Sequence, residues 1–113
     1  MQTETLIPDG ILQKIEALLN ERPRLWKNTT SKTCFMFSGR ENALTICDYL
    51  DSESINNISI CTIDNLGSID EMLIINSHEQ EIEYRKFKTL YLKIKDQVQK
   101  NIFTSLQSEL ERI

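Results

Sequence analysis

The chain has 113 residues, a net charge of -4 and a hydrophobic share of 40 %. That length suits a single domain over residues 1–113. The composition excludes a disordered or collagen-like chain, and no apolar run approaches the roughly 18 residues that a membrane-spanning helix needs. Residues 1–4 are polar and are not typical of a signal peptide, so the expected location is cytoplasmic or nuclear.

Charge is distributed unevenly along the chain. Residues 41–84 hold ten acids and neither Lys nor Arg, whereas residues 21–40 carry +4 and residues 85–100 carry +5. The acids are interleaved with apolar residues, which indicates a folded segment and not an acidic tail. The two basic segments are either ordinary solvated faces or contacts for an anion or an acidic partner, although the total charge of the chain is negative.

The first predicted element is an amphipathic helix over residues 11–20, whose apolar residues share one stripe and which ends before Pro23. Residues 21–31 are polar and basic and are predicted to be a loop. A buried strand is expected over residues 33–37, because β-branched, aromatic and apolar residues follow one another there. Helical spacing then returns at Ala43, Leu44, Cys47 and Leu50.

Two more strands are expected, over residues 55–63 and around residues 72–75, with a turn at residues 65–68. The order strand, helix, strand favours at least one parallel strand pair. The predicted fold class is therefore α/β to mixed α+β, with a small sheet of about three or more strands packed with helices.

The C-terminal region is predicted to be helical, because apolar residues recur at steps of three or four from Phe87 to Ile113. One helix over residues 79–112 would be about 50 Å long, too long for so small a domain unless it projects or dimerises. A break is therefore expected near Lys95 and Asp96.

Few residues suggest catalysis. Residues 37–42 are expected where a strand turns into a helix, so Ser38 and Gly39 form either a plain helix cap or, with Arg40, a weak phosphate site. His78 is the only histidine and is expected in a surface turn, and Asp70 with Glu71 is expected in a solvated turn. We therefore expect a protein that is not an enzyme and has no cofactor.

The three cysteines, Cys34, Cys47 and Cys61, fit neither a disulfide framework nor the thiol pairs of a zinc site, so no metal site is expected. Trp26 lies within a short basic segment, residues 22–27, that is similar to a nucleic-acid contact. Trp26 could stack there on an unpaired base, but the preferred interpretation is that it folds back as a lid on the core.

Taken in order, these segments resemble the small subunit of the KEOPS complex that binds the PRPK-type atypical kinase. Residues 6–19 are similar to the family's proline-containing turn and helix, and residues 35–44 with 58–61 are similar to its strand, turn, helix and apolar strand. Residues 87–93 and 106–113 resemble its last two helices. Relative to the family, the chain would lack an initial strand and helix, and Lys32 and Thr33 stand where an acidic residue is common.

The resemblance implies a non-catalytic subunit that binds the kinase and helps the complex capture tRNA for threonylcarbamoyl modification of an adenosine. The implied kinase contact is the apolar face formed by Ile102, Leu106, Leu110 and Ile113, which could instead complete the chain's own core. The implied tRNA contact is formed by Arg22, Arg24, Lys27, Lys32 and Arg40.

The alternative hypothesis is a small acidic immunity or inhibitor protein that binds a basic effector through residues 41–84. It predicts that Asp48, Asp51 and Glu53 contribute to the interface, and that binding weakens steeply with salt. An enzyme that uses the turn at Ser38 is a more distant alternative.

Overall fold

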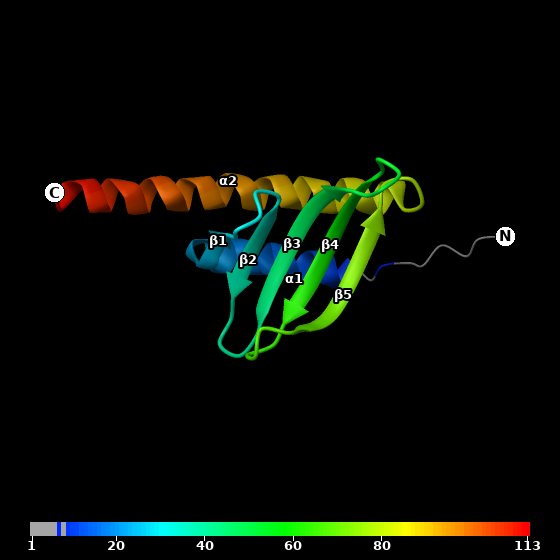
Figure 1. The fold of residues 1–113 in the computed structure, drawn as a ribbon, viewed down its shortest axis with the longest axis horizontal. Helices are drawn as coiled ribbons and strands as arrows, with labels where there is room; N and C mark the ends of the chain where they lie inside the picture. Colours follow the sequence, from blue (N-terminus) through cyan, green and yellow to red (C-terminus); the bar gives the residue numbers. More distant parts are fainter. Residues whose placement is uncertain (1–6, 8) are drawn as a thin grey trace.

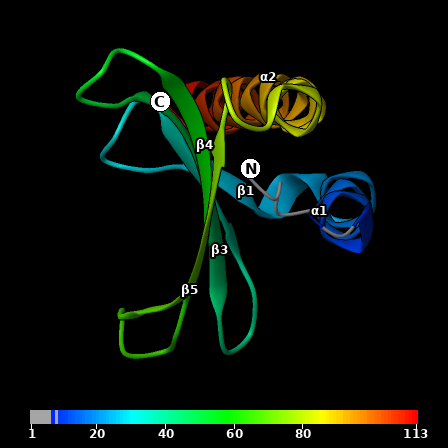
Figure 2. The same ribbon diagram turned by 90° about the vertical axis from the view of Figure 1, so that its right-hand side faces the viewer.

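Five antiparallel strands form one sheet, and two helices lie on one of its faces (Figures 1 and 2). The computed structural model describes Ile7 and residues 9–113. In chain order the elements are α1 (Asp9–Glu21), the short 3₁₀ helix η1 (Pro23–Leu25), β1 (Trp26–Asn28), β2 (Cys34–Ser38), β3 (Ala43–Leu50), β4 (Asn56–Ile63), β5 (Ile69–Asn76) and α2 (Glu81–Glu111). Neighbouring strands in the sequence are neighbours in the sheet, so the fold is mixed α+β, as predicted.

The segment expected to be a second helix is instead the strand β3. Every residue of β3 faces a residue of β4, from Ala43 opposite Ile63 to Leu50 opposite Asn56. Ile46 is fully buried between the strands and the helices. The β-branched and aromatic residues Thr45, Ile46 and Tyr49 favour a strand, and pairing on both sides of β3 overrides the helical spacing. The prediction of a parallel strand pair is therefore wrong: no helix connects β2 to β4, and β3 pairs antiparallel with both.

The core lies between the sheet and the two helices. Six of its residues come from strands β2 to β5, and the rest come mainly from α1 and α2. The sheet contributes Phe35, Phe37, Ile46, Ile58, Ile60 and Ile75. The α2 stripe contributes Phe87, Leu90, Tyr91, Ile94 and Val98. Burying these side chains supplies most of the driving force for folding.

Trp26 is part of this core. It lies in β1, inside the segment predicted to be a loop, and its side chain is fully buried with its ring 5.4 Å from that of Phe37. The prediction that Trp26 folds back as a lid is confirmed. Stacking of Trp26 on a nucleic-acid base is excluded in this fold, because no ring face is accessible.

Cys34 and Cys47 form a disulfide, contrary to expectation. They lie directly opposite each other on β2 and β3, with their Cα atoms 4.1 Å apart. Their spacing in sequence does not reveal this contact, because the hairpin register creates it. Cys61 is free and buried. Disulfides are rare in reducing compartments, so this pair is at odds with the expected cytoplasmic or nuclear location, which stays a prediction.

The helix α2 is continuous, so the break expected near Lys95 and Asp96 is wrong. Its 31 residues correspond to about 46 Å of helix. The sheet covers only the first part, and the C-terminal part extends beyond β1 (Figure 1). Val98 is the last buried residue of α2, and every residue after Asn101 is exposed. The long helix fits a small domain because it projects.

Two isoleucines on α2 test where the core ends. Replacing Ile94 with Ala should lower the free energy of unfolding by about 2–5 kcal/mol, because it leaves a cavity in the core. Replacing Ile102 with Ala should change it by less than about 0.5 kcal/mol in the monomer, because that side chain already faces solvent. Urea unfolding of both variants measures the difference, and equal losses would contradict the described boundary.

Candidate protein-binding surfaces

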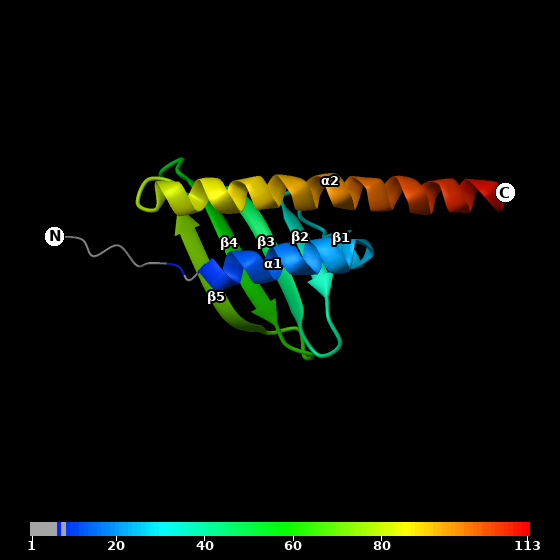
Figure 3. The same ribbon diagram turned by 180° about the vertical axis from the view of Figure 1, so that it is seen from behind.

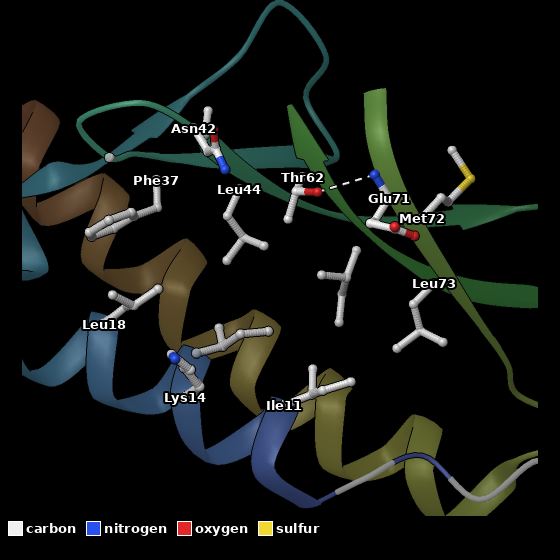
Figure 4. Close-up of a pocket in the computed structure, with 14 residues that line it drawn as sticks. Ile11, Lys14, Leu18, Phe37, Asn42, Leu44, Thr62, Glu71, Met72 and Leu73 are labelled. Carbon is white, nitrogen blue, oxygen red and sulfur yellow. Dashed lines mark hydrogen bonds between the residues drawn. The ribbon is translucent and has the colours of Figure 1, made fainter. Parts of the chain in front are cut away.

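An apolar groove of about 570 Å³ lies between α1 and the sheet (Figure 4). The helix contributes Ile11 and Leu18 to one wall, and the other wall comes from strands β2 to β5. Figure 4 shows Leu44 and Leu73 pointing from the sheet into the space beside α1. Such a groove, mostly apolar with few polar groups, is typical of a site for an apolar ligand or segment.

The groove is open because the two helices cover only part of the sheet. α1 crosses its middle, and the hairpin turns between β2 and β3 and between β4 and β5 extend past α1 (Figure 3). Only four of the residues that line the groove have polar side chains: Lys14, Asn42, Thr62 and Glu71. The Glu71 N–H donates to Thr62 Oγ1 at 3.1 Å, which holds one side of the rim.

Neither alternative for Ser38 to Arg40 is confirmed: Ser38 does not cap a helix, and the weak phosphate site does not form. Residues 39–42 make the hairpin turn between β2 and β3, so no helix N-terminus is present there. The Gly39 N–H donates to the Asn42 carbonyl at 2.9 Å, and a Cβ on Gly39 would lie 2.7 Å from that oxygen. Glycine is therefore required for the tight turn, not for an anion.

The projecting end of α2, defined as residues 99–111, carries three of the four apolar residues implied by the resemblance, and the fourth, Ile113, follows the end of the helix. Ile102, Leu106 and Leu110 follow Val98 at steps of four, so they continue the buried stripe in phase. The exposed fractions are 42 % for Ile102, 53 % for Leu106, 58 % for Leu110 and 99 % for Ile113. The alternative that these residues complete the chain's own core is wrong.

Phe103, on the same projecting end, is a large exposed residue that the sequence-based prediction did not include. It lies three residues before Leu106 and seven before Leu110, which places it on the same helix face, although it is not part of the step-of-four series. Its signal in the sequence is its size, since an exposed aromatic residue on a polar helix commonly marks an interface.

The five basic residues implied to contact tRNA are all exposed, but they do not form one patch. Arg24 and Lys27 border the same shallow depression beside α2. Lys32 and Arg40 lie in the turns at opposite ends of β2. Within the described residues none of the five forms an ion pair.

Three acids of residues 41–84 have structural roles. Asp48 pairs with Lys88 and accepts a hydrogen bond from Tyr84 Oη at 3.3 Å. Asp51 accepts bonds from the Ile55 N–H and from Asn57 Nδ2, and these bonds lower its pKa. The third, Asp64, accepts from two backbone N–H groups in the turn between β4 and β5.

Six of the ten acids of residues 41–84 are exposed, and they lie on separate elements: Glu41, Glu53, Asp70, Glu71, Glu79 and Glu81. Glu41 and Glu53 lie in turns, whereas Asp70 and Glu71 lie on β5 and not in the expected turn. His78 lies in an exposed turn, as predicted, where its backbone N–H donates to Asn76 Oδ1 at 2.8 Å.

No described helix covers the face of the sheet opposite α1 and α2, which is called the bare face below (Figure 2). On β5, Leu73 and Ile75 face the helices, while Met72 and Ile74 face the bare side and are about half exposed. An antiparallel sheet with one solvated face usually alternates apolar and polar residues. The apolar run on β5 therefore marks the bare face as a second surface that a partner could cover.

In the part of the chain that the structure describes, no three His, Cys, Asp or Glu side chains come together to hold a metal ion. Neither described helix is long and apolar enough to cross a membrane. Comparison with protein-family models, with curated proteins and with solved structures finds no match for this chain.

The contacts of Asp48 produce a testable pH dependence. Burial, reinforced by the Asp48 carboxylate, raises the pKa of the Tyr84 phenol to about 12. The unfolded chain releases this proton near the ordinary value of about 10, so the folded protein binds more protons between these values. Stability should therefore fall as pH rises from about 10 to 12. Thermal unfolding of the wild type and of Tyr84→Phe measures this, and an equal slope in both would contradict it.

Proposed function

We propose that this chain is a non-catalytic protein-binding module that docks onto a partner through the projecting end of α2. The observation that carries the proposal is the apolar stripe from Ile102 to Leu110, which continues the core stripe but has no cover within the described chain. Burying a Leu or Ile side chain is worth about 1.5–3 kcal/mol. A contiguous exposed row of this kind commonly marks an interface.

The more specific proposal is a subunit of the KEOPS assembly that binds the PRPK-type kinase. Three of the four residues implied for the kinase contact, Ile102, Leu106 and Leu110, lie on one exposed stripe, which supports it, and Ile113 is exposed just beyond the helix. Two elements depart from the family pattern: residues 43–50 form a strand where the family has a helix, and α2 is one helix where the family has two. The KEOPS assignment therefore stays a prediction, and the proposal of a protein-binding module does not depend on it.

Assistance in tRNA recruitment would involve the depression beside α2, where Arg24 and Lys27 lie together. Ile102 and Leu106 line the same depression, so tRNA and a partner on the apolar stripe would lie next to each other. The other three basic residues lie outside that depression, so they would contribute little to the same contact. Acids at Asp48 and Asp51 serve the chain's own structure, so no described feature favours the alternative of an effector-binding acidic surface.

The kinase-binding proposal is tested with the double variant Leu106→Asp and Leu110→Asp. Both side chains are exposed, so the fold should survive, while two carboxylates in an apolar contact should weaken binding at least about 100-fold. Ile82→Asp is the matched control, since Ile82 is an exposed apolar residue at the other end of α2. Titration of each variant against the purified kinase measures affinity. Equal affinity of all three proteins would contradict the proposal.

The tRNA proposal is tested with Arg24→Glu. This change should lower tRNA affinity and flatten its dependence on salt, because one phosphate contact is lost. Arg40→Glu is the control, because Arg40 lies in a distant hairpin turn. Fluorescence anisotropy at several salt concentrations measures both variants, and a loss that is the same for the two, or absent from both, argues against this contact.

A further inference from the structure

We infer that the partner of the projecting end of α2 is a second copy of this chain. In this arrangement the projecting end of each copy lies in the apolar groove of the other, and a two-fold axis normal to the sheet relates the copies near β1. The inference rests on the proposed function of α2 as a docking surface, and it names a second copy, in place of the kinase, as the occupant of that surface. The arguments are length, direction and charge.

The apolar stripe and the groove match in length. Ile102 and Leu110 are eight residues apart, which is about 12 Å at 1.5 Å per residue. The groove is lined by strands β2 to β5, and the three spacings of about 4.8 Å between four strands span about 14 Å. The stripe of Ile102, Leu106 and Leu110 would therefore meet apolar side chains along most of its length.

The directions also match. α2 lies near the end of the sheet that holds the loop between β3 and β4, where Lys88 pairs with Asp48 and Tyr91 Oη donates to the Thr33 carbonyl at 2.8 Å (Figure 1). The groove lies toward the opposite end, beside Gly39 and Asn42. A two-fold axis normal to the sheet exchanges these ends. The projecting end of one copy therefore arrives over the uncovered part of the other, beside its α1 (Figure 3).

The position of β1 permits this approach. It is the last strand on its side of the sheet and has three residues. α2 leaves the sheet at this strand, where Asn101 Nδ2 donates to the carbonyls of Pro23 and Trp26 at 2.9 and 3.0 Å. A second copy placed beyond β1 lies under the projecting helix on the same face that α1 and α2 already cover.

Charge allows the same arrangement at one point. Glu111 lies at the C-terminal end of α2, where the helix dipole adds partial negative charge, and Lys14 stands on α1 at the groove. Neither forms an ion pair among the described residues, whereas Glu109 already pairs with Arg112, and Glu71 lines the opposite wall of the groove. The contact is reciprocal, so it closes after two copies and does not continue into a fibre.

Oligomeric state tests the inference first. Sedimentation velocity of the wild type should give a species of twice the 13.2 kDa chain mass, in equilibrium with monomer. In the variant carrying Leu106→Asp and Leu110→Asp, the dissociation constant of the dimer should rise at least about 100-fold. Ile82→Asp, at the opposite end of α2, should associate as the wild type does.

Crosslinking tests the groove itself. A chain with Lys14→Cys and Leu110→Cys should form disulfide-linked dimers on mild oxidation, because these positions meet only between copies. The control carries Lys93→Cys with Leu110→Cys, since Lys93 is exposed on α2 away from the groove. It should remain largely unlinked. Both original side chains are exposed, so neither pair of changes should disturb the fold.

A wild type that is monomeric at every concentration would overturn the inference, as would a dimer that links equally in both cysteine pairs. If that monomer still loses a separate protein partner when Leu106 and Leu110 are replaced, the proposed function survives and only the second copy is wrong. If the double variant neither changes mass nor loses any partner, both are wrong.

Discussion

The apolar stripe of α2 is longer than the sheet that covers it, and the rest of the structure depends on this mismatch. From Phe87 to Val98 the stripe lies against the strands and closes the core. Beyond Val98 the same periodicity continues over exposed residues. A helix that projects in this way exposes apolar surface to water, which is unfavourable unless another surface covers it.

Specific contacts hold α2 in the position that creates the projection. Lys88 and Tyr84 bind Asp48 near one end of the sheet, and Asn101 binds the backbone around Trp26 at the edge formed by β1. These contacts fix both the direction of the helix and the point at which it leaves the sheet. With α1 across the middle of the same face, they also leave the groove open at the hairpin end (Figure 3).

The sequence predicts much of this fold, and the errors have physical causes. Periodicity placed α1, β4 and the helical C-terminus, and a run of β-branched, aromatic and apolar residues placed β2. The strand β3 was missed because Ala43, Leu44, Cys47 and Leu50 also satisfy helical spacing, and only pairing with β2 and β4 decides between the two. The disulfide depends on the same register. Spacing placed the apolar stripe on the C-terminal helix, but only the resemblance implied that its end is a contact. The groove joins four strands and a helix, which no local pattern reveals.

Amide hydrogen exchange along α2, followed at several protein concentrations, tests the central claim most directly. If the projecting end is covered by a second copy, amides of residues 99–111 and of the groove should gain protection together as concentration rises, while residues 87–98 stay protected throughout. Fast exchange of residues 99–111 that does not depend on concentration would contradict the account.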